Sequence, residues 1–121
     1  ANLSDANLTN ANLRNANLRG ADLFRANLSD ANLNGADLRG RNLTNTNLSN
    51  ANLNGADLSG TNLRGANLFR TDLINANLSG ADLSRANMFK VTATNLRGCP
   101  RFLPQGWICE NNSLIYFGRG Y

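Results

Sequence analysis

The amino-acid sequence predicts an all-β solenoid, in which the chain turns after every fifth residue and the turns stack into a tower. Three observations support this fold class. Eighteen consecutive five-residue blocks run from Ala1 to Lys90 and share the form Ala-Asn-Leu followed by two variable residues. The second residue is Asn or Asp in every block, and the third is Leu in seventeen blocks and Met in the last. Glycine recurs every twenty residues at the end of a block, at Gly20, Gly40, Gly60 and Gly80.

A period of five fits neither regular helices nor regular strands. Five residues advance an α-helix by about 500°, so the leucines would drift around every face. In a strand, successive leucines of this spacing would alternate between the two faces. The leucines can be buried together only if the chain turns at every block. Because the glycine spacing of twenty residues equals four blocks, the sequence indicates a four-sided coil.

Eighteen tandem blocks of this form resemble the pentapeptide-repeat family, and the resemblance covers about three-quarters of the chain. It implies a right-handed quadrilateral β-helix of about four and a half coils. It also implies that the third residue and the small first residue of each block face inward. One inner ladder would then consist of Leu3, Leu23, Leu43, Leu63 and Leu83.

Two further positions in the repeat carry expectations. The second residue, Asn or Asp, is expected to turn the corner and to bond the local backbone, as short polar side chains do in turns. Arg41 occupies a first position, where a small inward residue is expected. We expect its guanidinium to reach outward at a local distortion.

The chain is expected to divide into a β-helix over 1–98, with a register break at 91–93, and a capping segment over 99–121. The capping segment holds both prolines, both cysteines and the only tryptophan. An uncovered solenoid end leaves leucines and strand edges in water, so a cap is expected there. Its apolar residues would lie over the last coil: Phe102, Leu103, Trp107 and Ile108. Residues 106–114 resemble the C-terminal segment of cyanobacterial members of the family.

The two cysteines lie in this capping segment. Cys99 and Cys109 are expected to form a disulfide, and closing so short a loop contributes roughly 2.8 kcal/mol less any strain. The alternative is two unrelated free thiols. A structural disulfide favours an oxidising space, such as a periplasm or a thylakoid lumen, whereas reduced thiols fit the cytoplasm.

Composition excludes most catalytic chemistry. Histidine is absent, which removes the commonest general base and the commonest transition-metal ligand. Two cysteines without histidine cannot complete a tetrahedral zinc site. No phosphate-binding loop, dinucleotide fingerprint or nucleophile elbow occurs. We therefore expect no enzyme, no catalytic residue, no metal and no cofactor, and the absence of a long apolar run predicts no membrane span.

The favoured function is a non-enzymatic interaction or scaffold protein with an unidentified protein partner. Phe69, Ile74 and Phe89 occupy fourth positions, which point outward, and form the expected interaction surface. Phe69 and Phe89, twenty residues apart, would stack on one face, with Ile74 around the next corner. The alternative is that the C-terminal tail folds over them. An end-to-end homodimer through the first coil is a further expectation, because no cap precedes the leucines of that coil.

Arginine at outward positions gives the alternative function. Arg19 and Arg39 would stack on one side as a stripe for anions or nucleic acid, although a solvated, solubilising surface is the favoured explanation of these residues. Nucleic acid is disfavoured as a partner because asparagine, serine and aspartate interrupt the basic residues. Some family members are acidic, mimic duplex DNA and protect a topoisomerase. The net charge of +4 has the wrong sign for that role.

Overall fold

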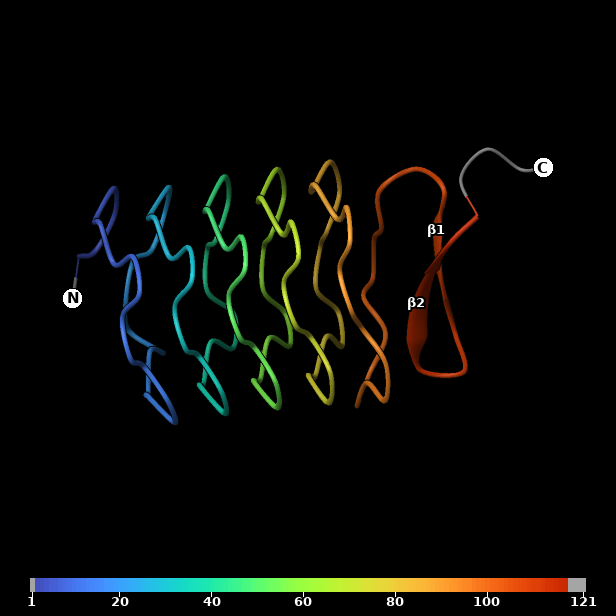
Figure 1. Ribbon diagram of the computed structural model, residues 1–121, viewed down its shortest axis with the longest axis horizontal. Helices are drawn as coiled ribbons and strands as arrows, with labels where there is room; N and C mark the ends of the chain where they lie inside the picture. Colours follow the sequence, from blue (N-terminus) through green and yellow to red (C-terminus); the bar gives the residue numbers. More distant parts are fainter. Residues whose placement is uncertain (1, 118–121) are drawn as a thin grey trace.

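The computed structural model describes residues 2–117, so the last four residues of the expected capping segment, 118–121, lie outside the described residues, as does Ala1. The chain forms a right-handed quadrilateral β-helix, and Figure 1 shows its coils side by side along the long axis of the molecule. The first coil and the β1–β2 hairpin lie at opposite ends of this tower. Residues 2–117 include no helical segment with the length and hydrophobicity of a membrane span.

The coils pair through isolated parallel bridges between second residues of blocks. Each of these bridges within the eighteen blocks joins residues twenty apart, as Asn27 pairs with Asn47 and Asn47 with Asn67. The Leu28 N–H donates to the Asn47 carbonyl at 2.7 Å, and the Asn47 N–H donates back to the Ala26 carbonyl at 3.0 Å. The structure therefore repeats after four blocks, as the glycine spacing predicts.

The fifth residue of each block makes the turn. Its φ lies between 57° and 72° at every fifth position from Asp5 to Lys90 except Gly20. The Leu3 carbonyl accepts a hydrogen bond from the Ala6 N–H at 3.0 Å, and the same turn recurs along the chain. Gly, Asn and Asp tolerate this left-handed backbone best, which explains their frequency at this position. Arg85 adopts it too, with a φ of 61°.

The second residue fixes the corner from the side. Its Oδ1 atom accepts a hydrogen bond from the N–H two residues later, as Asn52 does from Asn54 at 2.9 Å and Asp72 from Ile74 at 2.9 Å. This confirms the expected local bond. Only Asn and Asp place a carbonyl or carboxylate oxygen at this reach, which explains why no other residue occurs there.

Leucines fill the interior in stacked ladders. In the predicted ladder, Leu23, Leu43, Leu63 and Leu83 are fully buried, whereas Leu3 in the first coil is only partly buried. Three first positions hold threonine, and each buried hydroxyl donates to a leucine carbonyl of the preceding coil. These donors are Thr46, Thr61 and Thr71.

Arg41 distorts one side of the tower. Its guanidinium donates to the Arg39 carbonyl at 3.2 Å and to the Ala21 carbonyl at 3.4 Å, which confirms that the head reaches outward. One coil later on the same side, the pairing is regular again, because the Arg41 carbonyl accepts a hydrogen bond from the Asn62 N–H. Among residues 2–117, no bridge joins Asp22 to Asn42, although the other second residues of this side are bridged.

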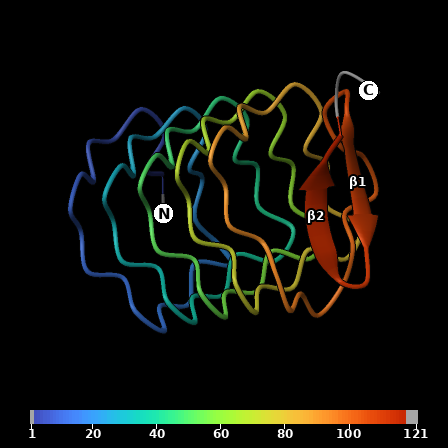
Figure 2. The same ribbon diagram turned by 45° about the vertical axis from the view of Figure 1, so that its right-hand side comes forward.

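The parallel pairing continues through the register break. Asp72 pairs with Thr92, Asn77 with Gly98 and Asp82 with Phe102, so the chain still follows the coil beyond residue 98. A hairpin then covers the end, made of β1 (Trp107–Glu110) and β2 (Ser113–Tyr116). Figure 2 shows this hairpin lying across the last coil.

The hairpin is antiparallel and is tied to the preceding coil by β2. Ile108 pairs with Ile115, and Cys109 pairs with Leu114. The Leu114 N–H donates to the Ala93 carbonyl at 2.9 Å, and the Leu114 side chain is buried in the core.

The first prediction concerns the turn residue. Arg85→Gly should stabilise the fold by roughly 0.5–1 kcal/mol, because glycine adopts a positive φ without the steric cost of a side chain. Urea denaturation followed by circular dichroism measures this change. Arg14→Gly, at a fourth position without a positive φ, is the control and should destabilise the fold. Equal effects of the two substitutions would contradict the argument.

The second prediction compares two members of one ladder. Leu63→Ala should lower the free energy of unfolding by about 3–5 kcal/mol, because the site is fully enclosed. Leu3→Ala should lower it by clearly less, because Leu3 is partly exposed and its site can collapse or fill with water. Thermal and urea unfolding of both variants provide the comparison, and a larger loss at Leu3 would be inconsistent with the observed burial.

Candidate interaction surface

Two phenylalanines form an exposed stack on one side of the tower. Phe69 and Phe89 occupy the fourth positions of blocks one coil apart, and their ring centroids lie 5.9 Å apart with planes 15° from parallel. Phe89 is 63% exposed, and Phe69 is half-buried. The outward direction of the fourth position and the period of twenty therefore place both rings together, as the sequence predicts for these residues.

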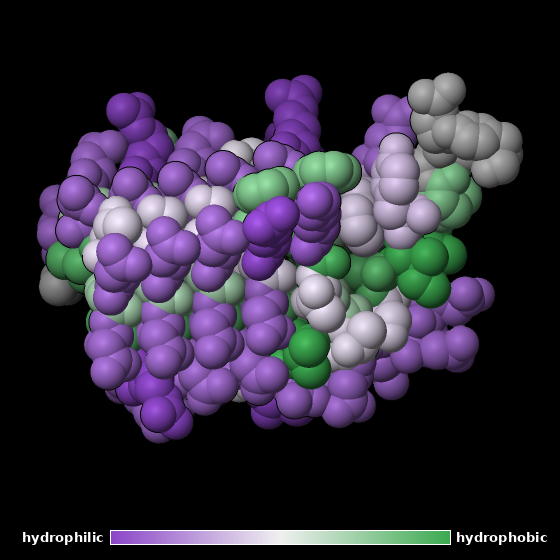
Figure 3. Space-filling view, viewed as in Figure 1, coloured by the Kyte–Doolittle hydropathy of each residue, from purple (hydrophilic) through white to green (hydrophobic). Residues whose placement is uncertain are grey.

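Cations lie over both rings. The Arg70 guanidinium carbon lies 5.4 Å from the Phe69 ring centre, and the Lys90 Nζ lies 5.6 Å from that of Phe89. Each cation follows its ring in sequence, at the fifth position with a positive φ. Figure 3 shows the larger group of apolar side chains towards the C-terminal end of the face in view, whereas polar side chains cover most of the tower and a smaller apolar group lies at its N-terminal end.

Ile74 lies apart from this stack. It belongs to the next block, which forms the neighbouring side of the coil, and it is half-buried. The expected surface is thus a stacked pair on one side, with Ile74 around the corner as expected from its place in the next block.

A groove lies beside the stack, between the last coil and the hairpin. Its volume is about 400 Å³, and it is bordered by Met88, Phe89, Pro104, Gln105, Trp107 and Tyr116. The rings of Trp107 and Tyr116 lie 5.3 Å apart between centroids and are tilted by 47°. The sequence reasoning missed this groove. Two features of the sequence could have indicated it: the change in composition after Lys90, and methionine in place of leucine at position 88.

The four expected cap residues divide into two groups. Leu103 and Trp107 pack against the core, whereas Phe102 is 49% exposed and Ile108 is 37% exposed. Alternation along β1 explains why Ile108 is exposed, contrary to the expectation, because its side chain points opposite to those of Trp107 and Cys109. Leu114 takes the buried place instead.

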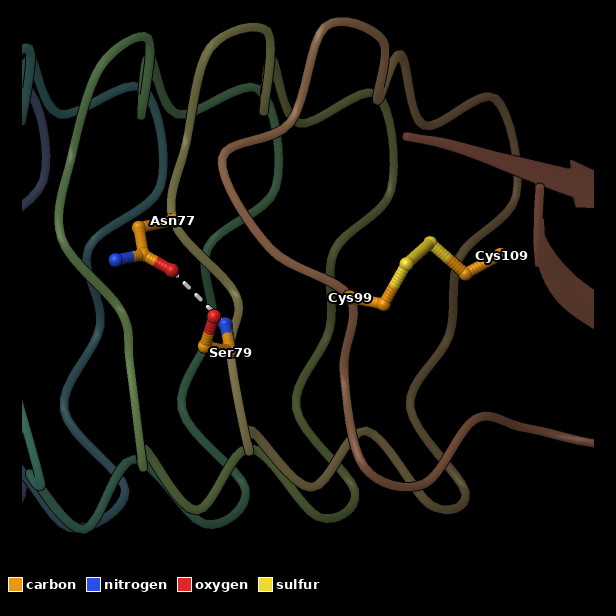
Figure 4. Close-up of a disulfide and its surroundings, with 4 residues drawn as sticks. All are labelled: Asn77, Ser79, Cys99 and Cys109. Atoms are coloured by element: carbon orange, nitrogen blue, oxygen red, sulfur yellow. Dashed lines mark hydrogen bonds between the residues drawn. A yellow bond between two sulfur atoms is a disulfide. The ribbon is translucent and has the colours of Figure 1, made fainter. Parts of the chain in front are cut away.

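Cys99 and Cys109 form a disulfide, as predicted, with Cα atoms 6.0 Å apart. No cysteine is free, so the alternative of two free thiols is wrong. Figure 4 shows the bond between Cys109 of β1 and Cys99, which follows the bridged residue Gly98, with the corner where Asn77 accepts from the Ser79 N–H nearby. The bond thereby fixes the hairpin, and with it one wall of the groove.

The expected arginine stripe is a row of mixed charge. Arg39 forms ion pairs with Asp37 at 2.8 Å and with Asp57, one coil on, at 3.6 Å. The hydrogen bond from Arg39 lowers the pKa of Asp37 to about 2, and the charge of Arg19 acts in the same direction. Asp37 in turn raises the pKa of Arg39. Arg39 is therefore already engaged by carboxylates.

The carboxylates show no arrangement for acid–base catalysis. Burial raises the pKa of Asp82, but hydrogen bonds from Ser84 and the charges of Arg64 and Arg101 outweigh it and leave this pKa lowered. A lowered pKa keeps the group ionised, which suits a corner acceptor rather than a proton donor. Within the described residues, no three cysteine or acidic side chains gather where they could hold a metal ion.

Comparison with known proteins agrees with this fold. The model of the pentapeptide repeat family matches residues 1–40, 31–68 and 66–99, with eight copies. The crystal structure of Rfr23, a pentapeptide repeat protein from the cyanobacterium Cyanothece 51142, is 38% identical with a TM-score of 0.73. That match covers 78% of this chain and 64% of Rfr23, so the chain spans less than two thirds of its length.

Two further structures are more distant. QnrB1, a plasmid-mediated fluoroquinolone resistance protein, is 17% identical with a TM-score of 0.54, over 84% of this chain and 66% of that one, and shares the fold alone. A pentapeptide repeat protein from the Arabidopsis thaliana thylakoid lumen is 33% identical with a TM-score of 0.35, over 70% and 63% of the two chains. No curated protein matches the sequence.

Because the family model spans residues 1–99 and a solved member matches in both sequence and fold, the chain belongs to the pentapeptide repeat family.

Proposed function

We propose that this protein is a non-enzymatic interaction scaffold that binds a protein partner through the surface formed by Phe69 and Phe89. The exposed phenylalanine stack beside an apolar groove is the observation that carries the proposal. A folded chain rarely leaves a contiguous aromatic patch in water unless a partner covers it. Aromatic residues also dominate the binding energy of protein interfaces.

The architecture suits a scaffold. A tower of stacked coils keeps its leucines inside, so the outward positions can vary without disturbing the core. The fourth positions on the side of Phe69 and Phe89 illustrate this, because the earlier coils carry Thr9, Ser29 and Ser49 there. An apolar surface has thus been placed on only the last two coils of that side.

Direct binding of anions or nucleic acid by Arg19 and Arg39 is the weaker alternative. Arg39 is engaged by Asp37 and Asp57, and a cation that is already paired releases few counterions from a nucleic acid. The net charge of +4 also argues against mimicry of duplex DNA. No residue pair supports an enzyme, because the aspartates at corners accept backbone hydrogen bonds.

An end-to-end homodimer through the first coil stays a prediction. Leu3, Leu8 and Leu13 are partly buried, in contrast to the fully buried leucines of later coils. Sedimentation velocity over a range of concentrations tests it, and a monomer at the highest concentration would remove it.

We also propose an oxidising compartment, such as a periplasm or a thylakoid lumen. The Cys99–Cys109 disulfide supports this, because structural disulfides persist where thiols are not kept reduced.

The third prediction tests the surface. Wild-type protein should retain one protein from an extract of the source organism at about 0.5 M salt, where exposed charges are screened, and nuclease should not release it. Phe69→Ser with Phe89→Ser should lose that protein. Phe24→Ser is the matched control, because Phe24 also occupies a fourth position beneath an arginine, Arg25 at 5.7 Å, but lies in an early coil. Release of the retained protein by salt or nuclease would contradict the proposal and would favour binding of anions or nucleic acid by the basic residues.

The fourth prediction tests the compartment. Alkylation of thiols at the moment of cell lysis should leave both cysteines unmodified until a reductant is added. Reduction should then lower the free energy of unfolding by roughly 2–4 kcal/mol, because a short loop is released. Cysteines that react with the alkylating reagent before reduction would indicate a cytoplasmic protein.

A further inference from the structure

We propose that the groove between the last coil and the β1–β2 hairpin binds an extended acidic segment of a partner protein, anchored by an aromatic or proline side chain. This inference rests on the proposed function, because it names the class of partner that the same surface would recognise.

The walls of the groove suit a flat apolar anchor. The last coil supplies Met88 and Phe89, the connection supplies Pro104, and the hairpin supplies Trp107 and Tyr116. A cavity of about 400 Å³ is at the small end of ligand-binding clefts, large enough for one bulky side chain and its neighbours. The tilt of 47° between Trp107 and Tyr116 lets a third ring meet one by its face and the other by its edge.

One amide side chain on the groove can serve a peptide backbone. Gln105 borders the groove and is exposed. Asn87 also borders the groove, but its Oδ1 accepts from the Phe89 N–H and its Nδ2 donates to Asn67 Oδ1. An amide such as that of Gln105 offers a donor and an acceptor, which are the two groups that an extended backbone presents in turn. Aromatic walls with a polar side chain also match the grooves that recognise proline-containing extended peptides.

The positive charges beside the groove favour a partner segment of negative charge. Lys90 lies over Phe89, which borders the groove, and Arg70 lies over the stacked Phe69. Arg85 is exposed and immediately precedes Ala86, another residue of the groove. The ion pairs of the described chain involve other arginines: Arg25, Arg39 and Arg64. Three cations without a carboxylate within ion-pair distance at this end attract an acidic segment and repel a basic one.

A single-stranded nucleic acid is the other polyanion that aromatic and basic residues bind. Such binding needs a series of free ring faces on which bases stack. Here Phe69 and Phe89 cover one face of each other, and Arg70 and Lys90 lie over the same two rings. The geometry therefore favours a peptide, and the nucleic acid becomes an outcome of the test.

Trp107 provides a direct readout, because it is the only tryptophan in the chain and borders the groove. The probes are a blocked hexapeptide with Phe-Pro between two pairs of glutamates, the same peptide with lysines for glutamates, and oligothymidylate. The acidic peptide should change the Trp107 emission saturably, with a Kd on the order of 0.1 mM or below. The lysine peptide should bind at least about tenfold more weakly.

Variants separate the charges from the walls. Arg70→Gln with Lys90→Gln should weaken the acidic peptide about three- to tenfold, because two peripheral cations are removed. Arg25→Gln is the matched control, since Arg25 lies over Phe24 in the same geometry at the other end, and it should leave the affinity unchanged. Tyr116→Ser should weaken both peptides by removing one wall.

Three results would overturn the inference: equal binding of the two peptides, no saturable change of emission up to about 1 mM peptide, or tighter binding of oligothymidylate. Failure here is distinguishable from failure of the proposed function. Suppose that a partner is retained at high salt, depends on Phe69 and Phe89, and is unaffected by Arg70→Gln with Lys90→Gln. The proposed scaffold function would then hold, and the acidic ligand would be wrong. Saturable binding of the acidic peptide by a protein that retains no partner would support the groove alone.

Discussion

A leucine must enter the interior every five residues, and the chain can bring it there only by turning between one leucine and the next. Two local features enforce the turn: the positive φ of the fifth residue and the hydrogen bond accepted by the second residue. Both lie within a single block, so each corner forms without help from distant sequence. The inward leucines, the outward fourth residues and the parallel bridges all follow from that corner.

This constraint also decides where function can lie. Regular coils present mostly polar sides, and the carboxylates at second positions are occupied by corner bonds, as at Asp57, and in part by arginine, as at Asp37. The groove described above lies where the regular pattern ends, between the last coil and the hairpin. The disulfide fixes the hairpin there, and Phe89, Trp107 and Tyr116 lie on the two sides of the groove. A structural cap and a candidate binding surface are therefore made from the same residues.

Most of the tower could be predicted from sequence because its contacts repeat. The twenty-residue period of glycine predicted the bridge partners, and the fourth-position rule placed Phe69 beside Phe89. The period of twenty also places Asp57 next to Asp37 on the following coil and thus near Arg39, although the ion pair of Arg39 with Asp57 was not predicted. The groove could not be predicted, because it depends on how β1 and β2 pair and on which face they turn inward. Phe102 and Ile108 look as suitable for the core as Leu114, and only the register of the hairpin decides among them.

The bond from Arg41 to the Ala21 carbonyl has a consequence for cooperativity. In a stacked array, stability is a sum of contributions from neighbouring repeats, so the array opens first at its weakest junction. One side of the junction between the second and third coils lacks a bridge, because a guanidinium takes the carbonyl that a backbone N–H uses elsewhere. The other three sides of this junction keep their bridges, so Arg41 weakens one of its four sides. We expect fraying from the first coil to stop or start at this junction more readily than at one with all four bridges, which leaves the distant aromatic surface undisturbed.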